Sequence, residues 1–295
     1  MKSFLLLAGF VLLAASCSKE TDVNLNEKEN TALIRVHVND FNVSLEPIFV
    51  TRGASTLADY NGINAITLAF YKSDNSQEYK TTQLKSDNTT YTTFGDFSLS
   101  LPMGSYTMVV LAYYTNEYSP FTLTSPTEAS YTGARARETF ATTQAVNITN
   151  TSALDISATL RRIISVLTVI SSDGRTADVS NVRMTVSGGS KSFNPTTGLA
   201  TDNVGFANTI GNSATVGTTS TSNTFLFLAT DEQTMDVTIE TLDASGNTLF
   251  STTVENVPFK RNSMTKLTGS IYSNSGIAGA FQINTDWLPD TNVSF

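Results

Sequence analysis

Only a few residues of this sequence combine the types and spacing that chemistry needs. His37 is the only histidine, and it lies in a strand-like alternation without the Ser, Cys or Asp arrangement of a catalytic triad. Asp231 and Glu232 are adjacent carboxylates, the residue type that serves glycoside hydrolysis or binds calcium. Neighbours in a strand or turn point apart, however, and no further ligand spacing follows. The pattern therefore favours a surface histidine and a solvated acidic turn.

Motifs for other chemistry are missing from the sequence. It has no phosphate-binding loop, no metal-ligand spacing and no nucleophile elbow. We therefore expect a protein that is not an enzyme and that binds no metal and no cofactor. Three late aromatic residues, Tyr272, Phe281 and Trp287, leave two interpretations open. They could form a sugar-stacking platform, but they are more typical of a hydrophobic core.

Cys17 is the only cysteine, and it follows a short apolar run. Lys2 precedes this run at residues 4–15, which is too short to span a membrane as a helix, and small residues at 14–16 suit a signal peptidase. Leu13 stands one place further from the cysteine than in the commonest lipoprotein signal. The pattern predicts a lipoprotein signal peptide over residues 1–16 and acylation of Cys17, which would attach the protein to a membrane. An ordinary cleaved signal and an uncleaved anchor are the alternatives.

The charge balance restricts the partners. The chain has 18 Lys and Arg against 26 Asp and Glu, a formal charge of −8 and a sequence pI near 4.7. No basic cluster interrupts this balance, which argues against nucleic acid as a partner. Residues 17–31 are polar and lack apolar periodicity, which predicts a flexible tether. Because the single cysteine would carry the lipid, we expect stability to come from hydrophobic cores without disulfides.

Apolar residues at every second position predict the strands of the first half. These segments are residues 33–38, 66–70 and 97–101. Residues 106–113 are apolar on both faces, as in a central strand, and the turn signal at residues 102–104 predicts that they form a hairpin with the strand before. Residues 115–143 are polar, and we expect a long irregular segment there with at most a short helix.

A second strand-rich block begins near Ala153. Its predicted strands are residues 154–160, 163–170, 182–186, 225–228, 237–239, 249–254, 266–272 and 281–283. Residues 243–247 predict a hairpin turn and residues 205–223 a long loop. A chain of 295 residues can bury two cores. We therefore predict an all-β protein of two stacked antiparallel β-sandwich domains, over residues 32–152 and 153–295.

Several stretches together resemble a known family. They are the signal that ends in Cys17, the strand–turn–strand stretch over residues 97–106, residues 158–162 and residues 257–269. Each is common in β-hairpins, but their order and spacing over nearly the whole chain are similar to the fimbrillin-type pilus proteins of Bacteroidetes, most closely the FimB/Mfa2 group of fimbrial subunits. The resemblance implies transthyretin-like sandwich domains and a non-enzymatic role in a fimbrium. It also implies other fimbrial subunits, and a host or bacterial surface receptor, as partners.

The resemblance further implies a mode of assembly. In such subunits a protease removes an N-terminal strand, and a strand from a neighbour fills the exposed groove. Here the strand lost would be residues 33–38, and Arg52 is the expected trypsin-like cleavage point. A chain that kept this strand and its lipid would instead be the pilus anchor, which ends the polymer at the cell outer membrane. The expected donor strand has apolar residues at alternate positions, which would equally suit the last strand of the second sandwich: Phe281, Ile283, Val293 and Phe295.

A different class of function also fits the sequence. A surface glycan-binding lipoprotein of a polysaccharide-uptake system would share the signal peptide and the stacked β domains. Retention on polysaccharides distinguishes the two, because a pilus anchor that is not an adhesin should bind none. In a tip adhesin, variation in binding would lie in the polar segments at residues 115–143 and 205–223.

Overall fold

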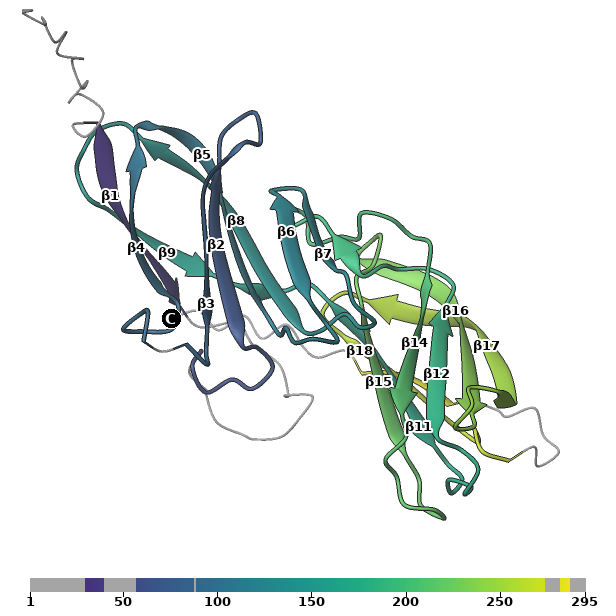
Figure 1. Ribbon diagram of the computed structural model, residues 1–295. Helices are drawn as coiled ribbons and strands as arrows, with labels where there is room; N and C mark the ends of the chain where they lie inside the picture. The colour runs from purple at the N-terminus through teal and green to yellow at the C-terminus, as the bar shows by residue number, and fades with distance from the viewer. Residues whose placement is uncertain (1–29, 40–56, 88, 274–281, 287–295) are drawn as a thin grey trace, which may run out of the picture.

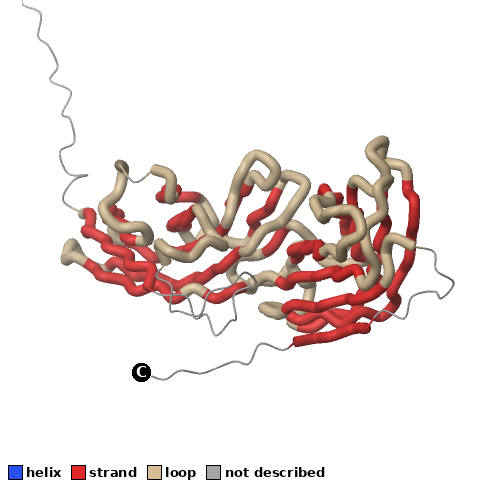
Figure 2. The backbone as a smooth tube through the Cα atoms, turned by 90° about the horizontal axis from the view of Figure 1, so that it is seen from below, coloured by secondary structure: helices blue, strands red, loops and turns tan. Residues whose placement is uncertain are grey.

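The computed structural model describes residues 30–39, 57–87, 89–273 and 282–286. These residues form five β-sheets, and no helix occurs among them (Figures 1 and 2). The described part is elongated, with one sandwich near each end (Figure 1). The prediction of an all-β protein built from two β-sandwiches is confirmed.

The N-terminal sandwich packs a three-stranded sheet against a five-stranded one. The smaller sheet has the order β4 (Asp96–Pro102), β1 (Thr31–Asn39), β9 (Leu154–Thr159). The larger has the order β10 (Arg161–Arg162), β8 (Thr139–Ile148), β5 (Gly104–Tyr113), β2 (Ala65–Tyr71), β3 (Gln77–Leu84). Alternate side chains of the smaller sheet, such as Ile34 and Leu99, pack against the larger sheet in one hydrophobic core. β9 and β10 follow the predicted boundary at residues 152 and 153, but they pair with β1 and β8 in this sandwich.

The C-terminal sandwich consists of two four-stranded sheets. Their orders are β15 (Thr221–Leu226), β11 (Ser165–Ser171), β18 (Met264–Gly269), β19 (Gln282–Asp286), and β14 (Phe206–Gly211), β12 (Asn181–Val186), β16 (Glu232–Leu242), β17 (Thr248–Lys260). Val169, Val182 and Ile239 are among the residues of the core between them. The predicted turn at residues 243–247 is confirmed, since the Asp243 N–H donates to the Asn247 carbonyl at 3.0 Å between β16 and β17. The predicted long loop at residues 205–223 is wrong, because it contains β14 and the start of β15.

A third hydrophobic cluster joins the two sandwiches. The hairpin of β6 (Phe121–Ser125) and β7 (Glu128–Tyr131) pairs with β13 (Ser192–Phe193) in a three-stranded sheet that combines residues from both halves of the chain. Its side chains pack on the outer face of the larger N-terminal sheet together with Phe227. The rings of Phe193 and Phe227 lie 4.2 Å apart between centroids, and both side chains are fully buried. The expectation of an irregular segment at residues 115–143 is therefore wrong, because it contains β6, β7 and the start of β8.

Each sandwich also contains one parallel strand pair, so the expectation of purely antiparallel sheets is corrected. β1 runs antiparallel to β4 and parallel to β9. β11 repeats this arrangement between antiparallel β15 and parallel β18. In both sandwiches the first strand thus lies in the interior of its sheet.

The predicted hairpin of β4 and β5 is wrong, because the two strands belong to different sheets. The chain crosses from one sheet to the other after Pro102, and the Tyr106 hydroxyl donates to the Pro102 carbonyl at 2.9 Å across this corner. The prediction that residues 106–113 form a central strand is confirmed, since β5 lies between β8 and β2.

Candidate assembly site

β1 is the strand on which the predicted assembly depends, and its two faces differ. Ala32, Ile34, Val36 and Val38 point into the N-terminal core, and none is more than 8 % exposed. Alternating with them, Leu33 and Arg35 are exposed and His37 is half-buried. The period-two pattern at residues 33–38 predicted this strand correctly, because β-branched residues suit a pleated, half-buried surface.

Both edges of β1 are paired along most of its length. Val36 lies opposite Phe97 of β4 and opposite Ile156 of β9. Burial of one isoleucine and two valines contributes about 5–9 kcal/mol, at about 1.5–3 kcal/mol for each side chain, and this is an upper bound. That sum is comparable to the net stability of a whole domain. A groove without β1 would have two unpaired edges and a bare apolar floor, so it requires a replacement strand.

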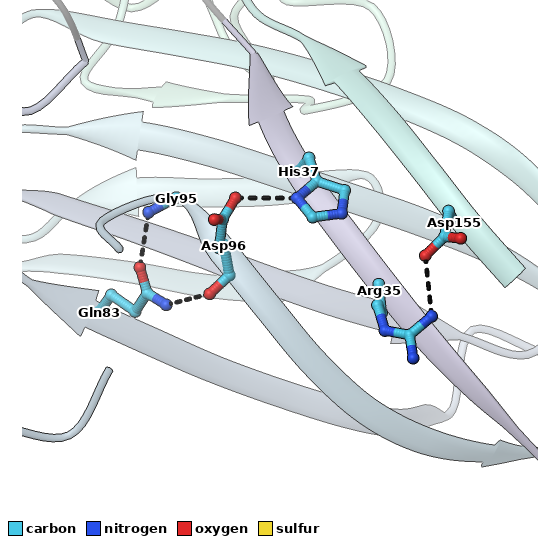
Figure 3. Close-up of polar contacts among 6 residues, drawn as sticks. All are labelled: Arg35, His37, Gln83, Gly95, Asp96 and Asp155. Carbon is cyan, nitrogen blue, oxygen red and sulfur yellow. Dashed lines mark hydrogen bonds and ion pairs between the residues drawn. The ribbon is translucent and has the colours of Figure 1, made fainter. Parts of the chain in front are cut away.

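Two polar pairs on the outer face connect β1 to its neighbours (Figure 3). The Arg35 Nη1 lies 3.3 Å from the Asp155 Oδ1 of β9, and the His37 Nδ1 lies 3.0 Å from the Asp96 Oδ1 of β4. All four side chains are 44–63 % exposed. Each pair therefore contributes at most about 1 kcal/mol, and its main effect is to favour one register and one side for β1. The expectation of a surface histidine is confirmed, but its partner Asp96 is distant in sequence and was not predicted.

The wall of the groove beside β1 is held by the side-chain amide of Gln83 in β3. Its Oε1 accepts from the Gly95 N–H at 2.8 Å, and its Nε2 donates to the Asp96 carbonyl at 2.7 Å (Figure 3). The Gly95 carbonyl in turn accepts from the Val38 N–H at 3.0 Å. Gly95 has a φ of +101°, and a Cβ there would lie 2.6 Å from the Leu57 Cδ2. The two bonds from Gln83 fix the start of β4 through β3 independently of β1, whereas the bond from Val38 would be lost with β1.

A buried ion pair that sequence reasoning missed lies where the chain leaves the N-terminal sandwich. The Arg162 Nη2 is 2.5 Å from the Glu138 Oε1, and both side chains are less than 10 % exposed. The Tyr60 hydroxyl donates to the same Glu138 oxygen at 2.7 Å. Burial, followed by the charge of Glu138, raises the pKa of Tyr60 above its ordinary value. The sequence signal for this pair is weak, because Glu138 and Arg162 are brought together only by the pairing of β8 with β10.

Most of the predicted assembly residues lie outside the described residues. These are Cys17, Arg52, Phe281, Val293 and Phe295. Ile283 lies in β19 opposite Leu267 of β18, at the edge of its sheet. Within the described residues, β19 thus belongs to the chain's own C-terminal sandwich.

The other candidates for chemistry are separated or buried. Asp231 and Glu232 are each about two-thirds exposed, and they pair with Arg261 at 2.6 Å and Lys260 at 3.2 Å. Tyr272 is buried, and its hydroxyl accepts from the Asn212 Nδ2 at 2.5 Å. Trp287 lies outside the described residues.

The described part of the chain offers no alternative centre of metal chemistry. It holds no group of three or more His, Cys, Asp or Glu residues placed to bind a metal ion. Among the same residues, no helix is long and apolar enough to cross a membrane.

Solved structures share this fold over most of its length. The fimbrial anchor protein Mfa2 from Porphyromonas gingivalis aligns with a TM-score of 0.52 at 11 % identity, over 87 % of this chain and 97 % of that one. A candidate adhesin from Bacteroides ovatus aligns with a TM-score of 0.51 at 12 % identity, over 84 % and 88 %. Another from Bacteroides thetaiotaomicron gives a TM-score of 0.51 at 10 % identity, over 87 % and 96 %. The resemblance to the FimB/Mfa2 group is thus confirmed at the level of the fold.

Sequence comparison adds the family. No curated protein matches the chain. A family of unknown function, DUF6562, matches residues 29–293 and so includes every strand described above. This chain therefore belongs to the DUF6562 family.

Proposed function

We propose that this chain is a non-enzymatic subunit or anchor of a surface fimbrium, held at the outer membrane by a lipid on Cys17. It assembles with other fimbrial subunits by β-strand exchange and contributes to cell adhesion. The observation that carries the proposal is the place of β1, which is the first strand of the fold and yet an interior strand of its sheet. The fold shared with Mfa2, itself described as a fimbrial anchor protein, supports the same role.

Cleavage after Arg52 would separate β1 from all later strands, because Arg52 lies between β1 and β2 in the sequence. The remaining chain would have an apolar groove between β4 and β9, which a strand from a neighbouring subunit would fill. An uncleaved chain would keep β1 and its lipid. Because each buried CH2 contributes about 0.8 kcal/mol to membrane binding, a subunit with several acyl carbons would stay at the membrane as the anchor.

N-terminal sequencing and intact mass of the protein from native outer membranes test the proposal. A complete chain with a lipidated Cys17 supports the anchor, and a free N-terminus at Gly53 supports a subunit that exchanges β1. An unlipidated start at Ser18 or earlier would overturn the lipid anchor. Arg52→Ala should abolish the Gly53 terminus, while the nearby Arg35→Ala, within β1, should leave it unchanged.

Adhesion is tested separately. Retention of the purified protein on a surface receptor or on cells supports the adhesive role. Retention on soluble polysaccharides alone, together with absence from purified fimbriae, would instead support a glycan-binding lipoprotein.

A further inference from the structure

We infer that the groove occupied by β1 selects an extended strand with basic residues on its outer face, and that, once β1 is lost, a different protein supplies this strand and not the C-terminal end of a second copy of this chain. The inference rests on the proposed exchange of β1 and names the chemistry of the partner strand.

The rim of the groove is acidic. The outward side chains of β4 and β9 beside β1 are Asp96, Ser98, Ser100, Asp155, Ser157 and Thr159. This set contains two carboxylates and no cation, and β1 supplies Arg35 and His37 to the two carboxylates (Figure 3). A strand that replaces β1 restores these pairs only if it has a cation or a hydrogen-bond donor at the same two places.

The floor of the groove accepts small and β-branched side chains. Ala32, only 1 % exposed, lies opposite Leu101, and the next inward positions hold Ile34, Val36 and Val38. Larger side chains at these positions would have to displace a closely packed core, which costs stability. The fitting strand therefore alternates a small residue and then β-branched residues inward with basic residues outward.

The C-terminal part of this chain has the opposite character. Residues 267–295 contain no Lys, Arg or His, and they contain Asp286 and Asp290. Their apolar alternation includes the large residues Phe281 and Phe295. In the groove of a second copy, such a strand would leave Asp96 and Asp155 unpaired. A donor from this end of the chain is thus suited to a different acceptor.

Peptide exchange tests the inference on the complete mature chain, cut once between β1 and β2 so that both pieces remain associated. Three fluorescent peptides compete for the groove: the β1 sequence TALIRVHVN, the same peptide with Arg35→Glu and His37→Glu, and residues 281–295. Incorporation is measured by fluorescence anisotropy and by co-elution in size-exclusion chromatography. Loss of one exposed ion pair corresponds to roughly a 2- to 5-fold effect, and the two glutamates also place like charges beside Asp155 and Asp96, so incorporation should fall about 10-fold.

The expected result is that the β1 peptide is incorporated best and the other two peptides at least about 5-fold less. High salt should reduce the difference in incorporation between the β1 peptide and the charge-reversed peptide. A chain with Asp96→Lys and Asp155→Lys should prefer the charge-reversed peptide. Equal incorporation of the β1 and charge-reversed peptides would overturn the inference while leaving strand exchange intact. Equal incorporation of residues 281–295 would make a second copy the partner. Failure of all three peptides, including that of β1, would overturn strand exchange itself.

Discussion

Replacing Phe227 by alanine removes a ring from the cluster shared by the two sandwiches. The ring is fully buried and stacks on Phe193 with centroids 4.2 Å apart and planes 27° apart. Deleting a buried phenylalanine side chain costs about 3–5 kcal/mol, since the transfer free energy is lost and a cavity remains. The ring belongs to the cluster that packs on the outer face of the larger N-terminal sheet, and Tyr131 of β7 also stacks on it at 6.4 Å between centroids. We therefore expect both sandwiches to be destabilised.

Urea denaturation followed by circular dichroism gives the free energy of unfolding, and hydrogen exchange measures β5 and β12 separately. Phe227→Ala should lower the protection of both strands. Phe193→Ala combined with Phe227→Ala should cost less than the sum of the single changes by about 0.5–1.5 kcal/mol, the coupling of an aromatic pair. Phe206→Ala, at a partly buried position packed on the C-terminal core, is the control and should affect β12 alone. A loss below about 1 kcal/mol, or one confined to β12, would refute the shared core.

Three further predictions concern the N-terminal strand, an ion pair and a turn. Ile34→Ala should cost about 2–5 kcal/mol because the side chain is fully buried, whereas the outward Leu33→Ala should cost less than about 1 kcal/mol; equal urea midpoints would contradict the assignment of faces. Arg183 holds the pKa of Glu240 below its ordinary value of 4.5, so this stabilisation is complete above pH 4.5 and is lost as the pH falls through the lower folded-state pKa. In a plot of unfolding free energy against pH, Glu240→Gln should therefore reduce the loss of stability below pH 4.5. An unchanged loss would show that the Arg183–Glu240 pair does not cause it. Gly95→Ala should cost about 1–3 kcal/mol because of its positive φ and the close leucine carbon, and an unchanged melting temperature would show that the turn relaxes freely.

Strand identity was predictable from the sequence where burial alternates along the chain itself. β1 and β4 each have one buried and one exposed face, and β5 is buried on both, as the apolar pattern indicated. The sheet to which a strand belongs was not predictable in the same way. The residues at 102–104 indicate only that the chain turns, and local sequence does not distinguish a reversal within one sheet from a crossing to the opposite sheet.

The hairpin β6–β7 could not be predicted because its partners are distant. Each of its two strands alternates apolar and polar residues, but with only two apolar residues apiece the period-two signal is too short to be distinctive. Burial of Phe121 and Tyr131 depends on Phe193 and Phe227, which come more than sixty residues later in the chain. The pairing of His37 with Asp96 could not be predicted for the same reason, since only the register of β1 against β4 places the two side chains together.

The pairing of β1 on both edges also determines how the protein would respond to pulling. The start of β1 lies at the end of the molecule away from the C-terminal sandwich (Figure 1). If the proposed lipid held the N-terminus, a force between it and a load on that sandwich would pull on β1 from its first residue. The hydrogen bonds to β4 and β9 would then be loaded in shear and would share the tension. They would not break one after another from one end of the strand. The same strand that a single cut would separate covalently from the later strands is therefore arranged to resist mechanical extraction.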